Sequence, residues 1–113
     1  MGDSSASRTL RKLSREEAFY FFTSIGNYTG VSAASLEEFV EKIREVNTKS
    51  LEFHLYRWDF EKWTTEVLED EKLAEQIKSV RSLGVTGGAL RDQLCSTVLK
   101  RYEELKRQLP PFS

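Results

Sequence analysis

The segment from residue 35 to residue 46 constrains the fold of this chain most, because its apolar residues repeat with the period of an α-helix. The repeating residues, spaced i, i+3, i+4, i+7 and i+10, are Leu36, Phe39, Val40, Ile43 and Val46. Ser35 and Glu38 have the spacing of a capping box, in which each side chain satisfies a free backbone amide at a helix start. The segment is therefore predicted to be an amphipathic helix with one face buried.

Similar signals predict helices along most of the remaining chain. The expected starts are Ser14, which has capping-box spacing to Glu17, then Ser50, Asp59, Asp70 and Thr86. The first of these helices is expected to end at Gly26, and a loop is expected from there to Ala34. Gly84 is expected in the left-handed conformation that ends the helix after Asp70, and the last helix is expected to run to about Gln108 before Pro110 and Pro111.

These elements predict an all-α fold, with five or six helices packed orthogonally or as a bundle in one compact domain. A length of 113 residues suits a single domain that buries its own core. Residues 1–12 are rich in small polar residues and are expected to form a flexible tail. The helical domain is expected over residues 13–109, and a short C-terminal tail over residues 110–113.

The charge and cysteine content argue against several classes of protein. The net charge of −1 provides no general attraction to nucleic acid or to an anionic membrane. No apolar run is long enough to cross a bilayer and no signal peptide is evident, so a cytoplasmic protein is expected. The single cysteine, Cys95, rules out an internal disulfide and lies in an apolar helical stripe, where it is expected to be buried.

The richest candidate site lies between Phe53 and Trp63, a stretch that contains the only histidine and both tryptophans. His54 and Arg57 would share one face of a helix, and Asp59 follows where the chain turns. An aspartate that accepts a hydrogen bond from histidine or arginine could fix the tautomer and orient the ring for acid–base chemistry. The same three residues could instead line a binding pocket, or could simply organise a junction in which Asp59 caps the next helix and pairs with Arg57.

Trp58 lies on the same connection, between Arg57 and Asp59. An exposed tryptophan beside an arginine has the composition of an interface hot spot. The alternative is that Trp58 covers the edge of the core. The residues expected to bind a partner are therefore His54, Arg57, Trp58 and Asp59.

Other motifs are weaker. Thr86, Gly87 and Gly88 open a helix whose free amides could hold an anion, although a flexible connection is the better interpretation. One histidine and one cysteine argue against a zinc site, and no motif indicates a cofactor or a catalytic residue.

Parts of the chain resemble a family of uncharacterised small proteins and domains from archaea and bacteria. The resemblance covers roughly residues 18–77. It rests on Ser-Leu at residues 35–36, on His-x-x-Arg-x-Asp-Phe-x-x-Trp at residues 54–63 and on Asp-x-x-Leu-Ala at residues 70–74. It implies that His54, Arg57, Asp59 and Trp63 belong together and that the source is an archaeon. Trp58 departs from the pattern, where a small residue is expected, and the family brings no established activity.

The function expected from these observations is a non-enzymatic binding or adaptor module that engages a protein or a small ligand near the segment from His54 to Trp63. One alternative is a small ligand sensor or enzyme that uses His54 with Asp59. A weaker alternative is nucleic-acid binding through the basic termini. It would require one face to carry Arg8, Arg11, Lys100, Arg101 and Arg107.

Overall fold

The computed structural model describes the backbone of residues 2–109 and the side chains of residues 6–109. Six helices and one two-stranded antiparallel sheet lie within this range, so the all-α prediction is wrong and the fold is mixed. The helices are α1 (Gly2–Thr9), α2 (Leu36–Glu45), α3 (Thr48–Tyr56), α4 (Asp59–Glu66), α5 (Glu71–Ser82) and α6 (Gly87–Arg107). The strands are β1 (Phe19–Ser24) and β2 (Asn27–Ala33).

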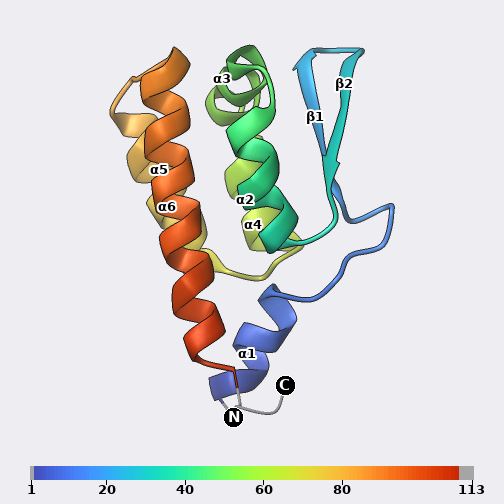
Figure 1. Cartoon of the computed structure of the whole chain (residues 1–113), viewed down its shortest axis with the longest axis vertical. Helices are drawn as coiled ribbons and strands as arrows, with labels where there is room; N and C mark the ends of the chain where they lie inside the picture. The colour runs from blue at the N-terminus through green and yellow to red at the C-terminus, as the bar shows by residue number, and fades with distance from the viewer. Residues whose placement is uncertain (1, 110–113) are drawn as a thin grey trace.

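The elements form three upright layers, shown in Figure 1. α5 and α6 lie on one side, α2, α3 and α4 lie in the middle, and the β1–β2 hairpin covers the other side. The short helix α1 lies beneath them, near the end of α6. The segment expected as a flexible tail thus includes α1, whose Ala6 is buried. The tail expected at residues 110–113 lies outside the described residues.

The hairpin replaces the helix predicted after Ser14 and the loop predicted after Gly26. The expected turn does form at Ser14, where the amides of Glu17 and Ala18 both donate to its carbonyl, but the chain then becomes extended. Burial alternates from Phe19, which is buried, to Tyr20, which is exposed, to Phe21, which is fully buried. A short apolar run does not distinguish a helix from a strand by period alone, and aromatic residues favour a pleated surface.

The turn of the hairpin depends on glycine. Ser24 pairs with Asn27, so Ile25 and Gly26 form the two-residue connection. Gly26 has φ +84°, a left-handed conformation that other residues adopt only with strain. The register shifts between Phe21 and Phe22, which indicates a β-bulge in the middle of the ladder.

The helix starts were predicted with mixed success. Ser35 accepts from the amide of Glu38, and Asp70 accepts from the amide of Leu73, so both predicted caps are confirmed. Gly84 has φ +69° after α5, as expected. Ser50 does not cap α3, because Asn47 does so by accepting from the amide of Lys49.

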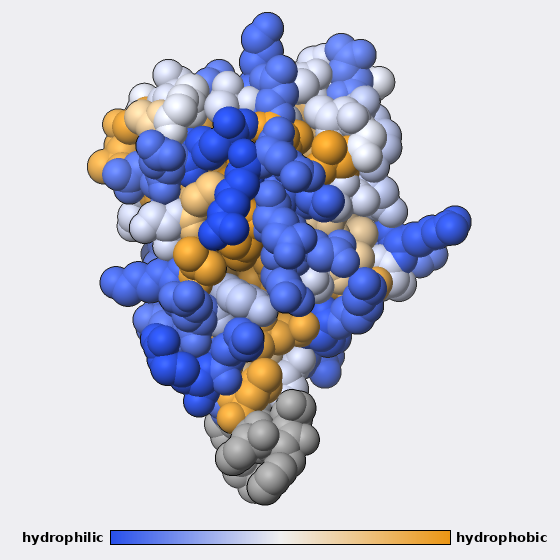
Figure 2. Space-filling view, viewed as in Figure 1, coloured by the Kyte–Doolittle hydropathy of each residue, from blue (hydrophilic) through white to orange (hydrophobic). Residues whose placement is uncertain are grey.

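An aromatic cluster holds the hairpin to the helices. The ring of Phe19 lies 4.9 Å from Phe21, 5.6 Å from Phe39 and 5.1 Å from Phe60, measured between ring centroids. Phe21, Phe39 and Phe60 are fully buried. On the face shown in Figure 2, polar and charged residues cover most of the surface, and hydrophobic residues show in separate small patches, one of them at the upper left edge. The core therefore lies between the three layers, and the hairpin completes it.

Candidate functional site

His54 lies in α3 and is 5 % exposed. Its Nε2 accepts a hydrogen bond of 2.8 Å from the backbone amide of Phe22 in β1. Its Nδ1 lies 2.8 Å from Oδ2 of Asp59. Because a backbone amide can only donate, Nε2 must be the acceptor, and Nδ1 therefore carries the proton that it donates to Asp59.

Burial lowers the pKa of the His54 imidazole, and the hydrogen bond and negative charge of Asp59 oppose this shift only in part. The ring is therefore neutral at neutral pH. Both of its nitrogens already have partners within the protein, so neither is free to take a proton from a substrate. This arrangement makes His54 a link between α3, β1 and the start of α4.

Asp59 does not cap α4, contrary to the prediction. It is the first residue of the helix, the cap position is occupied by Trp58, and no side chain bonds to the free amides there. The carboxylate instead uses Oδ2 to accept from both His54 and Arg57, the latter through Nε at 3.2 Å. Its other oxygen, Oδ1, has no hydrogen-bond partner among residues 6–109.

Arg57 ends α3, and its side chain is about half exposed. The guanidinium carbon lies 4.8 Å from the centre of the Phe53 ring, at a distance typical of a cation–π contact. Its Nε donates to Asp59, whereas its two Nη groups have no hydrogen-bond partner in the described part of the chain. Arg57 is therefore positioned by the protein but retains free donors.

Trp58 points to the other side of this junction. Its φ of 70° is left-handed, a conformation that costs a large non-glycine residue about 1–2 kcal/mol. The side chain is 58 % exposed, and the guanidinium of Arg81 lies 4.2 Å from the centre of its ring. Arg81 is in turn held by two hydrogen bonds to Glu61, of 2.9 and 3.0 Å. An exposed, strained and stacked tryptophan is thus presented at the surface.

Two open grooves meet at this junction. The first, of about 420 Å³, has aromatic walls and is lined by Phe19, Tyr20, Phe22, Ile25, Gly26, Phe53, His54, Arg57 and Asp59. The second, of about 750 Å³, is more polar and is lined by Tyr56, Arg57, Trp58, Asp59, Glu61, Lys62, Thr65 and Glu66. Arg57 and Asp59 line both grooves, so the two grooves share this ion pair. Of the four predicted binding residues, His54 lines only the first groove, Trp58 lines only the second, and Arg57 and Asp59 line both.

Sequence reasoning missed the hairpin side of the first groove. Tyr20, Phe22 and Ile25 were assigned to a helix, and Arg81, which lies in α5, was not linked to Trp58. A signal for the hairpin was present in the aromatic run before Ile25-Gly26-Asn27, because such a run followed by a glycine turn is typical of a hairpin. No local pattern pointed to Arg81.

The anion site considered at the start of α6 is filled by the protein itself. Oε2 of Glu52, in α3, accepts a hydrogen bond of 2.7 Å from the amide of Gly87. A carboxylate in this position is stabilised by the free amides and the dipole of the helix. The residues from Thr86 to Gly88 therefore dock α6 onto α3.

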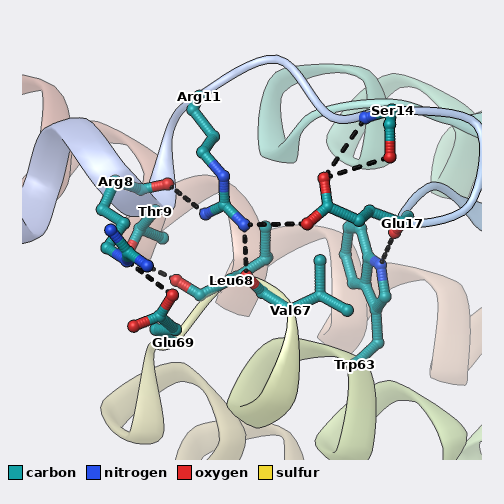
Figure 3. A network of polar contacts seen from close by, with 9 residues as sticks. All are labelled: Arg8, Thr9, Arg11, Ser14, Glu17, Trp63, Val67, Leu68 and Glu69. Atoms are coloured by element: carbon teal, nitrogen blue, oxygen red, sulfur yellow. Dashed lines mark hydrogen bonds and ion pairs between the residues drawn. The ribbon is translucent and has the colours of Figure 1, made fainter.

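Several basic side chains near the two ends of the chain are also paired within the protein. Figure 3 shows Arg11 donating to the carbonyls of Arg8 and Val67, and Arg8 paired with Glu69. Beside them, Thr9 donates to the carbonyl of Leu68 and Trp63 donates to the carbonyl of Glu17. This network joins α1 and the chain before β1 to the junction of α4 and α5.

A basic side chain of α6, near the C-terminal end, is likewise paired with a carboxylate of the protein. Arg101 makes two hydrogen bonds to the buried carboxylate of Asp70, of 2.8 and 3.0 Å. Three of the five basic residues that a nucleic-acid site would require, Arg8, Arg11 and Arg101, are thus already neutralised by carboxylates. This pairing disfavours a basic binding face.

Cys95 is half-buried in α6 and packs against the core. Burial raises the pKa of its thiol, so the reactive thiolate is disfavoured at neutral pH. Among the side chains of residues 6–109, no cluster of three or more histidine, cysteine, aspartate or glutamate residues is arranged to hold a metal ion. Over the same range, no helix combines the length and apolar character needed to cross a membrane.

A comparison with family models matches residues 14–111 to a family described as "Family of unknown function (DUF5752)". No curated protein and no solved structure matches the chain. The matched range includes the hairpin, both grooves and all the helices after α1. The match does not bear on the archaeal or bacterial range or on the His-x-x-Arg stretch, and both stay predictions.

Proposed function

We propose that this chain, which belongs to the DUF5752 family of unknown function, is a non-enzymatic module that binds a protein partner through the surface around Trp58. The observation that carries the proposal is the conformation of Trp58. Its large ring is mostly exposed although its backbone adopts a strained left-handed conformation. Strain of this kind persists where the surrounding structure imposes it, and it is concentrated at functional sites.

The contacts of Trp58 support this proposal. Arg81 stacks on the ring and is fixed by Glu61, so the aromatic surface is held in place before any partner arrives. A preorganised side chain loses little rotational freedom on binding, which favours affinity. Tryptophan and arginine are also the residues most enriched at the centres of protein interfaces.

The alternative of an enzyme or sensor that uses His54 with Asp59 has less support. Both nitrogens of His54 are occupied, and one of them bonds to the backbone of a strand. Proton transfer between Nε2 and a ligand would require the hydrogen bond from the backbone amide of Phe22 to break. The imidazole thus has the geometry of a structural link rather than of a general base.

The test compares Trp58→Ala with Leu83→Ala as baits for proteins of the source cell. Leu83 is also 58 % exposed but lies outside both grooves, so it is a matched control. We expect the Leu83 variant to retain the wild-type partner and the Trp58 variant to lose about 2 kcal/mol or more, about 30-fold in affinity. Both should remain folded by circular dichroism.

Cross-linking gives a second measurement on the same surface. Lys62 lines the groove beside Trp58, so a lysine-reactive reagent should join it to the partner recovered with the wild type. A partner that binds the Trp58 variant with undiminished affinity, or that cross-links only at lysines far from this groove, would refute the proposal.

A further inference from the structure

The first groove, between β1 and the C-terminal end of α3, has walls suited to one large apolar side chain. Its volume of about 420 Å³ is in the range of small ligand sites. The walls are mainly aromatic, and Ile25 stands at the hairpin tip with 83 % of its surface exposed. Such exposure is unusual for isoleucine, and it leaves an apolar edge available to an occupant.

The charged residues that line this groove, Arg57 and Asp59, offer hydrogen-bond donors and an acceptor. Within residues 6–109, the two Nη groups of Arg57 have no hydrogen-bond partner, and Asp59 uses only Oδ2 in its two bonds, which leaves Oδ1 without one. Their formal charges are opposite and their side chains are paired. A ligand carboxylate would be repelled by Asp59 and an ammonium by Arg57, so a neutral group with one acceptor and one donor is the best complement.

A peptide unit is such a group, because its carbonyl accepts and its amide donates. We infer that this groove holds a large apolar side chain from an extended segment of the partner, while Arg57 and Asp59 bind the neighbouring peptide unit. The inference rests on the proposed function and specifies the chemistry of the partner at the groove that adjoins the Trp58 surface through Arg57 and Asp59. Strand addition at this edge of β1 is not the mode, because the amide of Phe22 already donates to His54.

The first experiment uses small probes and nuclear magnetic resonance of the labelled protein. N-acetyl-phenylalanine amide carries the ring and an amide group on each side of it. N-acetyl-phenylalanine differs only in having a carboxylate in place of the C-terminal amide. We expect the amide to bind with a dissociation constant of about 1 mM, reasonable for about 15 non-hydrogen atoms, and the acid to bind at least about 5-fold more weakly. The shifted resonances should belong to Phe22, Ile25, Gly26, Phe53 and Arg57.

The second experiment places a charge at the rim of the groove. Ile25→Asp should weaken amide binding by about 10-fold or more, since the probe would have to pack against a carboxylate. Leu83→Asp, at another exposed apolar position outside this groove, should leave binding unchanged. Unchanged cross-peaks for the core of the Ile25 variant would confirm that the hairpin still folds.

The outcomes separate this inference from the proposed function. Failure of the amide to saturate at about 20 mM, tighter binding of the acid, or full binding to the Ile25 variant would overturn the peptide site. The importance of Trp58 for the cellular partner is measured independently, so the proposed function can stand when the peptide site fails. If the partner binds the Trp58→Ala variant with wild-type affinity but the amide probe still binds as expected, only the proposed function is refuted.

Discussion

His54 and Trp58 are four residues apart, yet the fold uses them in opposite ways. His54 is almost fully buried, and each of its nitrogens has one short hydrogen bond within the protein. Trp58 is mostly exposed, has left-handed backbone geometry and contacts Arg81 through the face of its ring. Asp59, the residue after Trp58, pairs with both His54 and Arg57, and this ion pair lines the grooves on both sides of the junction.

A rare residue type is therefore not by itself evidence of a functional site. A single histidine attracts attention as a candidate for catalysis, but here its hydrogen-bonding capacity is consumed by the fold. The tryptophan contributes little burial and keeps a free surface, which is what recognition of a partner requires. His54 and Trp58 differ in exposure and in whether their polar atoms are already bonded within the protein, and these properties indicate a binding role better than residue type does.

The largest expected effect lies on the buried side. Phe60 is fully buried and packs against Phe19 and Phe39, with ring centroids 5.1 and 5.4 Å apart. Phe60→Ala should lower the free energy of unfolding by about 3–5 kcal/mol, because it empties an aromatic site in the core. Urea denaturation measures this loss, and Phe60→Leu should lose clearly less. A loss below about 1 kcal/mol for the alanine variant would show that the segment is not anchored here.

The next effect concerns His54 itself. His54→Ala should cost about 1–3 kcal/mol, since the half-buried amide of Phe22 and the carboxylate of Asp59 each lose a partner. The same denaturation measurement checks this value. The hairpin should suffer most, so amide hydrogen exchange should accelerate in β1 more than in α5. Uniform acceleration throughout the chain would argue that His54 does not specifically hold the strand.

The pH dependence sharpens this prediction. Because burial lowers the pKa of folded His54 below the ordinary value of 6.5, the unfolded chain binds a proton more readily than the folded one. Stability from this residue is therefore fully present above pH 6.5 and decreases as the pH falls toward the lower folded pKa. The difference in unfolding free energy between the wild type and His54→Ala should narrow from pH 7 to pH 5. A widening difference would contradict the neutral ring.

The smallest effect lies on the exposed side. Trp58→Ala removes a surface cation–π contact with Arg81 and keeps the left-handed strain, so it should cost about 0.5–1 kcal/mol. Trp58→Gly removes the strain as well and should be about 1 kcal/mol more stable than the alanine variant. Thermal denaturation of the pair measures the difference. An alanine variant as stable as the glycine variant would mean that the backbone relaxes and that no strain is stored at Trp58.

The helices that the sequence predicted correctly are those whose signals are local. The stripe from Leu36 to Val46 and the cap at Ser35 act within α2, and Asp70 and Gly84 mark the two ends of α5 in the same way. Capping bonds and helical periods connect residues three or four apart, so they can be recognised without knowing what the helix packs against.

The hairpin could not be recognised in that way. The capping signal at Ser14 is genuine, but it produces one turn before the chain extends into β1. The strand is favoured by the packing of Phe19 and Phe21 against Phe39. It is also favoured by the hydrogen bond from the amide of Phe22 to His54, which lies 32 residues further along the chain. These contacts exist only when the hairpin and helices are assembled, and such tertiary contacts override local propensity.

The candidate site also has features that local spacing predicted and features that depend on tertiary contacts. The sequence determined by itself that His54, Arg57, Trp58 and Asp59 would be close together, because short spacings at a helix junction permit little else. Only the tertiary structure decided that His54 is buried under the hairpin and that Arg81 reaches Trp58 from α5. It also decided that β1 and α3 enclose a groove. Local spacing fixes which residues are neighbours, whereas burial and free bonding capacity depend on chain segments that meet only in the folded protein.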